Sequence, residues 1–288
     1  MLSPSHEMFA QGAALARRLA PQLCRKGPAH GEDCSWYHGL WQDLRLLGLA
    51  ATPEQQADFF RNAFARLPRG PVRVLISGSA DYSILDHVLP ACSENGLTAK
   101  ITVADLCETP LYFNRWYSEQ AGMQIETVQA DIFQHRFETP FDVICSHGFL
   151  SQFPPTRRAE LLRQWSRSLV PGGKVFLVNR VRPAPSGAET KFSEQQGREF
   201  CEALEGKLRA NDSIPKADWA GILARAIIYV QRLIGYALTE EELAGLFEQG
   251  GFEIDDCQIV ATGKQDNALN GPAIPTRARH ACIIASRR

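Results

Sequence analysis

Hydrophobic residues recur along the chain with two different periods. In the first part of the chain and again near 239–251 they are spaced three to four positions apart, which is typical of amphipathic helices. From residue 72 onward, short uninterrupted apolar runs alternate with such helical stretches, which is typical of strands buried on both faces of a sheet. The predicted strands lie at 72–77, 100–105, 125–131, 141–147 and 173–181, and the helices between them at about 81–94, 109–122 and 155–170.

This alternation predicts an α/β fold with a Rossmann-like, mainly parallel sheet that carries helices on both faces. Two or three helices interrupt the pattern at about 190–236. The alternation then resumes with the helix at 239–251 and strands at 252–262 and 280–286.

The residues before the first strand predict a set of helices. Apolar residues at helical spacing begin near residue 6 and continue until Pro21, which we expect to interrupt the helix. A later helix is marked by Thr52 as N-cap, Pro53 at the first helical position and Gln55 of a capping box. We therefore expect an N-terminal helical cap at 1–70 and a larger domain at 71–288 with a helical insertion at about 183–237.

Composition and charge narrow the class of protein. The 288 residues are 44% hydrophobic and 22% charged, as in ordinary globular proteins. The net charge of −1 argues against a nucleic-acid partner or an anionic membrane surface. The most apolar long segment, 219–238, contains Arg225, Gln231 and Arg232, so we interpret it as an amphipathic helix and expect no membrane span.

The cysteines indicate a reducing compartment. Because none of them forms a C-x-x-C pair, the spacing argues against a zinc or iron–sulfur cage, and we expect no bound metal. Arg17 and Arg18 follow a short alanine-rich stretch instead of preceding an apolar run, which is not a signal-peptide layout, so we expect a cytoplasmic protein. The eight cysteines are Cys24, Cys34, Cys92, Cys107, Cys145, Cys201, Cys257 and Cys282.

Acidic residues end two of the predicted strands, and Gly78 follows the first strand in the run "VRVLISGSADYSIL". The carboxyl ends of parallel strands meet at one edge of a sheet, where ligands bind. Asp105 ends the second strand, where a carboxylate can accept hydrogen bonds from both hydroxyls of a ribose. Asp131 ends the third strand and can accept a hydrogen bond from the exocyclic amine of an adenine.

Together with the turn in "LVPGGKVFLV" and the segment "TEEELAGLFEQGGFEI", these residues make the chain resemble the class I S-adenosylmethionine-dependent methyltransferases. The resemblance covers about 72–181 and 239–286. It implies a sheet of seven strands whose last strand, 280–286, is antiparallel, and S-adenosylmethionine as the cofactor. The residues it places at the cofactor are Gly78, Ser79, Ala80, Asp81, Asp105, Leu106, Asp131, Ile132 and Ser146.

The loop after the first strand departs from the family pattern of an acid, an apolar residue and G-x-G-x-G. Ile76 stands in the place of the acid, and Ala80 and Tyr82 in the places of the second and third glycines. Asp81 has two roles open to it, which are compatible: it can pair with the ammonium group of the cofactor, or it can act as an N-cap or first-turn acid of the following helix.

His147 is the candidate catalytic residue, because it follows the fourth strand at the ligand-binding edge and an imidazole titrates near neutral pH. The alternative is that it only hydrogen-bonds the loop or lines the cofactor pocket. Aromatic and imidazole groups of the predicted cap and insertion are candidates for the acceptor pocket, although helix docking on the sheet would also account for them. These candidates for substrate binding are Trp36, Tyr37, His38, Trp41, Phe149 and Tyr229.

The sequence therefore favours a biosynthetic small-molecule O- or N-methyltransferase, with a homodimer as a possible assembly. Methyl transfer from a sulfonium requires that the nucleophile, the methyl carbon and the sulfur are aligned and that water is excluded. Some acceptors also need a base, but a metal ion is not obligatory. Two rival functions remain open: a non-catalytic cofactor- or partner-binding protein that retains the fold, and a nicotinamide-dependent reductase. The reductase is the weaker hypothesis because no G-x-G-x-x-G motif is present.

Overall fold

A computed structural model describes residues 6–24, 33–49, 57–182, 184–261 and 279–288. The helix signal at Thr52, Pro53 and Gln55 lies outside the described residues. Within the described part of the chain, no helix is both long enough and apolar enough to cross a membrane.

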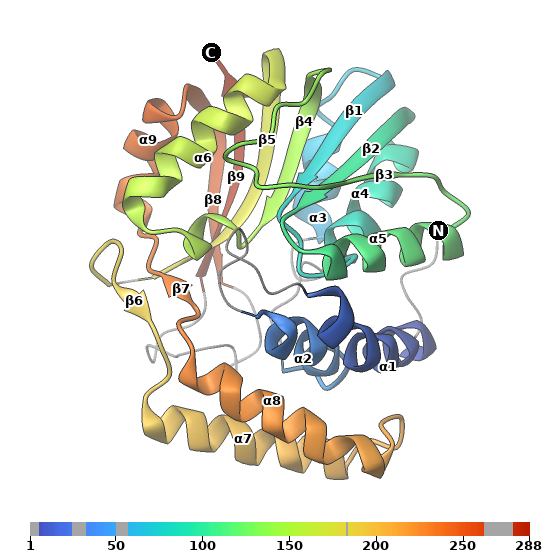
Figure 1. Cartoon of the computed structure of the whole chain (residues 1–288). Coiled ribbons are helices and arrows are strands. Elements are labelled where there is room, and N and C mark those ends of the chain that lie inside the picture. The colour runs from blue at the N-terminus through green and yellow to red at the C-terminus, as the bar shows by residue number, and fades with distance from the viewer. Residues whose placement is uncertain (1–5, 25–32, 50–56, 183, 262–278) are drawn as a thin grey trace.

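The centre of the molecule is the predicted sheet of seven strands (Figure 1). Its order is β3-β2-β1-β4-β5-β9-β8. The last strand in the sequence, β9, is inserted between β5 and β8 and is antiparallel to both, whereas β1 pairs in parallel with β2 and β4. The strands are β1 (Gly70–Ser77), β2 (Leu97–Asp105), β3 (Glu126–Gln129), β4 (Phe141–His147), β5 (Leu169–Val181), β8 (Phe252–Ala261) and β9 (Arg279–Arg287).

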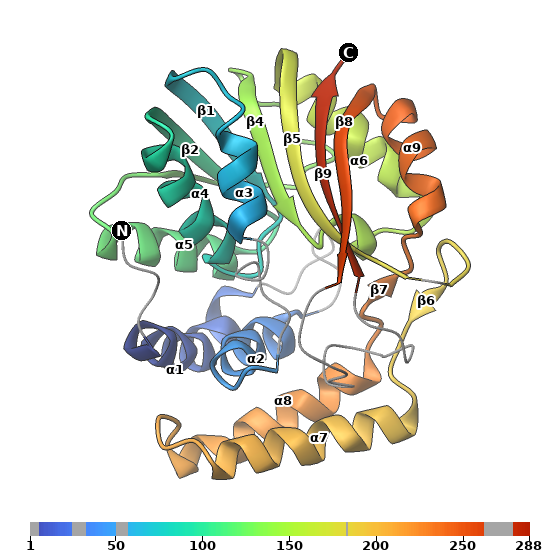
Figure 2. The same cartoon turned by 180° about the vertical axis from the view of Figure 1, so that it is seen from behind.

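Helices cover both faces of this sheet. Successive residues of a strand point to opposite faces, and the buried strands are apolar on both, so both faces pack against helices. In β1, Val74 and Ile76 belong to the core under one set of helices, whereas Leu75 belongs to the core on the other face. Figure 2 shows α3 and α4 in front of the sheet and α6 behind it. The first face carries α3 (Ala57–Phe64), α4 (Ser83–Glu94) and α5 (Glu108–Gln120), and the second α6 (Pro155–Ser168) and α9 (Glu240–Gln249).

Four further helices lie beyond the carboxyl ends of the parallel strands (Figures 1 and 2). We call them the helical layer: α1 (His6–Leu23), α2 (Ser35–Leu46), α7 (Glu194–Arg209) and α8 (Trp219–Gln231). Leu40 of α2, Phe200 of α7 and Ile222 of α8 are fully buried in one apolar cluster, so helices far apart in the sequence share a core. A short ribbon of β6 (Glu189–Thr190) and β7 (Gly235–Tyr236) connects α7 and α8 to the sheet domain.

Two local predictions were wrong. Pro21 lies inside α1 and does not end it. Proline has no N–H, which leaves the carbonyl of Arg17 without its helical donor; the guanidinium of Arg225 on α8 donates to that carbonyl instead, at 3.2 Å. The Pro-Gly-Gly sequence was expected to form a turn between a helix and a strand, but it lies inside β5, which begins at Leu169. The pairing of β5 with β4 shifts register at this point.

Candidate functional site

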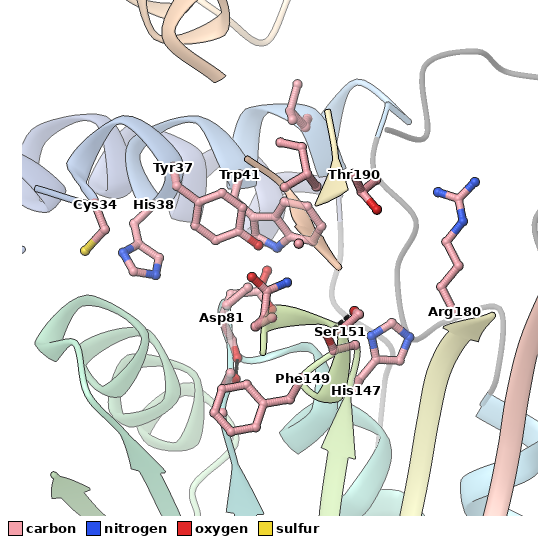
Figure 3. A pocket seen from close by; sticks show the side chains of 18 of the residues that line it. Cys34, Tyr37, His38, Trp41, Asp81, His147, Phe149, Ser151, Arg180 and Thr190 are labelled. Carbon is pink, nitrogen blue, oxygen red and sulfur yellow. Dashed lines mark hydrogen bonds between the residues drawn. The ribbon is translucent and has the colours of Figure 1, made fainter. Parts of the chain in front are cut away.

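A cavity of about 480 Å³ lies between the carboxyl edge of the sheet and the helical layer (Figure 3). Its size is that of a pocket for a small molecule or a nucleotide-sized cofactor. The loop after β1 and the ends of β2, β4 and β5 form its floor, and α2, β7 and Tyr229 of α8 form the opposite wall. Arg158 of α6 holds β7 in place, since its buried guanidinium donates to the carbonyls of Tyr236 (3.0 Å) and Ala237 (2.8 Å).

The loop after β1 depends on the glycine at position 78. Gly78 has a φ of 69°, and a Cβ there would overlap the ring of Phe149. A side chain at this position is therefore excluded by both conformation and space. Two of the three residues that depart from the family pattern are core residues: Ile76 is fully buried, and Tyr82 stacks on Tyr117 with ring centroids 4.8 Å apart.

Asp105 lines the cavity, and its carboxylate has hydrogen-bond acceptor sites left for a ligand. One carboxylate oxygen accepts the backbone N–H of Ser79 (3.0 Å), and the other accepts that of Cys107 (2.8 Å). Burial raises the pKa of Asp105 to about 6, against the lowering effect of these hydrogen bonds. Because a carboxylate has about four acceptor sites, lone pairs remain for two hydroxyl groups.

Asp81 lies just before Tyr82, the N-cap residue of α4, so it is neither the N-cap nor a first-turn acid of that helix. One of its oxygens accepts the N–H of Ser83 at 2.8 Å in the first turn of α4. The other accepts from Arg45 (2.6 Å) and Gln42 (3.1 Å) of α2. Asp81 and Arg45 are both buried, so the carboxylate already has a cationic partner, and its pairing with a cofactor ammonium group stays a prediction.

The end of the cavity near β4, β5 and β9 is rich in cationic and titratable groups. His147 lies there beside His280, with ring centroids 6.3 Å apart, and Arg180 and Arg182 line the same region. Burial, together with the charges of His147, Arg180 and Arg182, lowers the pKa of His280 to about 3. His280 is therefore neutral at neutral pH.

An aromatic wall from α2 and α8 faces this floor. Tyr37 packs against Trp41 with ring centroids 5.4 Å apart, and Trp36 against Tyr229 at 6.1 Å. Burial raises the pKa of Tyr37, and the nearby Tyr229, Asp81 and Asp105 contribute. The indole N–H of Trp41 is buried and has no hydrogen-bond partner among the described residues, so a ligand in the cavity can provide an acceptor for it.

Twelve of the sixteen predicted site residues line this cavity, which therefore combines cofactor and acceptor candidates in one space. The residues that line it are Gly78, Ser79, Ala80, Asp81, Asp105, Trp36, Tyr37, His38, Trp41, His147, Phe149 and Tyr229.

 

The other four of the sixteen predicted site residues do not line this cavity. Asp131 lies in the turn after β3, which ends at Gln129, and accepts the N–H of Phe133 at 2.9 Å. Ser146 is fully buried and donates to the carbonyl of Ser77 at 2.8 Å. The remaining two are Leu106 and Ile132. Cofactor contacts of these four residues stay predictions.

The sequence reasoning missed Arg180, Arg182 and His280. A signal for them was present, because Arg180 and Arg182 alternate at the end of the fifth strand in "VNRVRP", and His280 begins the last strand. Alternate residues of a strand point the same way, so the two arginines reach one side of the sheet edge.

A cluster of three thiols and an imidazole adjoins the cavity. It consists of Cys24, Cys34, Cys107 and His38, and their four ligand atoms all lie within 4.8 Å of one another. Hydrogen bonds with Cys24 and Cys34 lower the pKa of the Cys107 thiol, and His38 contributes. The absence of a C-x-x-C pair gave no warning of this cluster, because its members come from three separate segments.

Comparisons with known proteins agree with this fold. A family model described as a methyltransferase domain matches residues 86–173. No curated protein sequence matches the chain.

Two solved structures illustrate the likeness. The [4+2]-cyclase SpnF is 13% identical, with a TM-score of 0.54 over 100% of this chain and 97% of that one. The 1,6-didemethyltoxoflavin-N1-methyltransferase of Burkholderia thailandensis is 18% identical, with a TM-score of 0.52 over 91% of this chain and 92% of that one. At these identities the structures establish the fold alone.

The strand order with β9 inserted antiparallel and the match of residues 86–173 to a methyltransferase domain agree with the fold that the resemblance to the class I S-adenosylmethionine-dependent methyltransferases implies.

Proposed function

We propose that the protein transfers a methyl group from S-adenosylmethionine to an oxygen or nitrogen atom of a small-molecule acceptor. The observation that carries this proposal is the cavity itself: Asp105 and the Gly78 loop form one wall, and the aromatic residues of α2 and Tyr229 form another. One cavity therefore has groups suited to a nucleoside and groups suited to an organic acceptor.

The residues present fit the cofactor. Asp105 has free acceptor capacity for the two ribose hydroxyls, and the loop from Gly78 to Ala80 exposes only small side chains to the cavity. The indole N–H of Trp41 can donate to an oxygen of the cofactor or of the acceptor. When bound, the cofactor supplies an electrophilic methyl group that is already activated by the sulfonium charge.

His147 is proposed to remove the proton from the acceptor hydroxyl or N–H as the methyl group is transferred. It lines the cavity at the end of β4, and its neighbour His280 is neutral. A neutral neighbour allows His147 to gain a proton without placing a second imidazolium beside it. The aromatic wall excludes water and orients the acceptor.

Arg180 and Arg182 suggest the chemistry of the acceptor. Both side chains line the cavity at the end where His147 lies. Guanidinium groups favour carboxylate and phosphate partners. We therefore propose an acceptor that carries an anionic group in addition to the nucleophilic oxygen or nitrogen.

The alternative is a protein that keeps the cofactor-binding fold without methyl transfer. The buried pair of Asp81 and Arg45 favours this alternative, because it occupies a carboxylate that was expected to meet the cofactor ammonium group. The similar structure of SpnF is described as a [4+2]-cyclase, so this fold also occurs in a protein of another described activity.

The test combines binding and turnover. Calorimetric titration with S-adenosylhomocysteine measures cofactor binding, and a donor with a labelled methyl group is then incubated with phenols, alcohols and amines with and without a carboxylate or phosphate. Binding together with labelled product, highest with the anionic acceptors, is the expected result. Binding without product from these acceptors or from a metabolite extract supports the alternative, and absence of binding rejects methyl transfer and leaves only a partner-binding protein that retains the fold.

A further inference from the structure

The thiol and imidazole cluster beside the cavity has the arrangement of a metal site. The Sγ atoms of Cys34 and Cys107 are 3.7 Å apart, and those of Cys107 and Cys24 are 3.6 Å apart. Nδ1 of His38 lies 3.2 Å from Sγ of Cys24 and 3.5 Å from Sγ of Cys107. All six separations among these three sulfur atoms and one nitrogen are within 4.8 Å.

The two sulfur–sulfur distances and the two sulfur–nitrogen distances are close to those of tetrahedral zinc coordination. With Zn–S bonds of about 2.3 Å and a Zn–N bond of about 2.0 Å, tetrahedral angles place ligand sulfurs about 3.8 Å apart and sulfur and nitrogen about 3.5 Å apart. A disulfide requires sulfur atoms about 2.05 Å apart, so neither pair of sulfurs is bonded in this arrangement.

We propose that Cys24, Cys34, Cys107 and Nδ1 of His38 bind one zinc ion. Three cysteines and a histidine form a recognised structural zinc set, and four protein ligands leave no open position. The three thiols release their protons to solvent as the Zn–S bonds form, and the histidine binds in its neutral form.

The surroundings of the cluster suit such a site. Cys24, Cys107 and His38 are buried, and Cys34 is half-buried at the N-cap of α2. The hydroxyl of Thr109, itself fully buried, lies 3.1 Å from Sγ of Cys24, where it can donate to a thiolate. Outer hydrogen bonds of this kind orient metal ligands and tune their affinity.

The ion would connect the helical layer to the cofactor-binding sheet. Cys24 follows α1, Cys34 and His38 belong to the start of α2, and Cys107 lies between β2 and α5. The N–H of Cys107 also donates to Asp105 at 2.8 Å. Zinc would therefore hold α1 and α2 over the cavity and position the loop that supports Asp105.

Metal content of the full chain tests this inference. The protein is purified under reducing conditions from cells grown with added zinc, and its metals are measured by mass spectrometry. We expect about one zinc per chain in the wild type and a loss of at least tenfold in Cys34→Ser. Cys201→Ser is the matched control, because Cys201 is also half-buried in the helical layer but lies outside the cluster, and it should keep the zinc.

Two further measurements test the zinc site even if Cys34→Ser does not fold. Wild-type protein stripped of metal is titrated with Co²⁺, and thiolate charge-transfer bands together with strong visible absorption are expected for a tetrahedral sulfur-rich site. Thr109→Val should keep the four ligands and weaken zinc binding by about 10- to 100-fold.

Three results would overturn the inference. The first is equal zinc content in the wild type, Cys34→Ser and Cys201→Ser, and the second is metal-free wild type that gives no cobalt–thiolate bands. The third is a disulfide within the cluster in protein purified without an oxidant. Because metal content and cobalt spectra require no turnover, failure of the zinc site and failure of the proposed methyl transfer are distinguishable.

Discussion

Asp105 accepts one backbone N–H on each carboxylate oxygen, and its remaining lone pairs are available to a ligand. This makes its role in cofactor binding testable with a near-isosteric change. Asp105→Asn replaces one acceptor oxygen with an amide group, which leaves a buried ribose hydroxyl poorly paired. We expect S-adenosylhomocysteine affinity to fall by about 1–3 kcal/mol, measured by calorimetry.

Asp255→Asn provides the control for this change, because Asp255 pairs with Lys174 on the surface of the sheet, outside the cavity. It should leave the affinity unchanged. Equal affinity of Asp105→Asn and the wild type would contradict the cofactor assignment.

His147→Gln tests the proposed base. Glutamine keeps polar groups in the cavity but cannot accept a proton at neutral pH, so kcat should fall by about 10²- to 10⁴-fold. Cofactor affinity should stay within about twofold, because the ribose contacts proposed for Asp105 remain. A matched loss of affinity, or unchanged kcat, would assign His147 a structural role.

The burial of His280 predicts a pH dependence of stability. Its pKa is lowered to about 3 in the folded protein, whereas the unfolded value is about 6.5. The unfolded state therefore binds a proton more readily, and the stabilisation that is present above pH 6.5 is lost as the pH falls towards 3. The contribution of His280 to the free energy of unfolding should decrease by up to about 1.4 kcal/mol per pH unit in this window.

Urea unfolding of the wild type and of His280→Gln between pH 7 and pH 4.5 measures this contribution, with His135→Gln as the control outside the cavity. The free energy of unfolding should fall less steeply with decreasing pH in His280→Gln than in the wild type. Parallel curves for the wild type and His280→Gln would show that His280 is not buried in its neutral form.

At the scale of elements, α2 is attached to the loop after β1 by a buried ion pair. Arg45 and Asp81 have side chains only 1% and 2% exposed, and Gln42 of α2 also donates to Asp81. The guanidinium of Arg45 further lies over the rings of Phe9 and Tyr82, at 4.7 and 5.2 Å from their centroids. One side chain therefore joins α1, α2 and the start of α4.

Arg45→Met should destabilise the protein strongly, because it leaves the carboxylate of Asp81 buried without its charge partner. The expected loss is about 3–5 kcal/mol in the free energy of unfolding, measured with urea. The double variant Arg45→Met/Asp81→Asn should recover part of this loss. Arg61→Met removes an exposed pair with Asp58 and should cost less than about 1 kcal/mol; equal losses in the two single variants would contradict the buried pair.

The predictions about elements differ in how well they agree with the structure. The strands were found because strands buried on both faces of a sheet are short apolar runs, and β1, β2, β4, β5 and β9 lie where such runs occur. The prediction that Pro21 ends the first helix was wrong because Arg225, more than 200 residues away in the sequence, donates to the carbonyl that the proline leaves without a donor. A prediction made from neighbouring residues alone cannot identify such a distant hydrogen-bond donor.

At the scale of the whole molecule, the site is formed where distant segments meet. Helices α1 and α2 from one end of the chain and α7 and α8 from the later insertion form one layer over the carboxyl edge of the sheet (Figure 1). The sequence indicated which residues end the strands and which aromatic residues the helices carry. It did not indicate that Arg180, Arg182 and His280 would face His147.

The sequence by itself determined the alternation of strands and helices, the α/β class and the acid at the end of β2, because these follow from local periodicity and from the chain order of a parallel sheet. Only the tertiary structure decided that Asp81 pairs with Arg45, that Asp131 lies outside the cavity, and that Cys24, Cys34, His38 and Cys107 meet. The physical reason is that these contacts depend on how the helical layer packs against the sheet edge. That packing joins residues far apart in the sequence, and no local pattern records their distance in space.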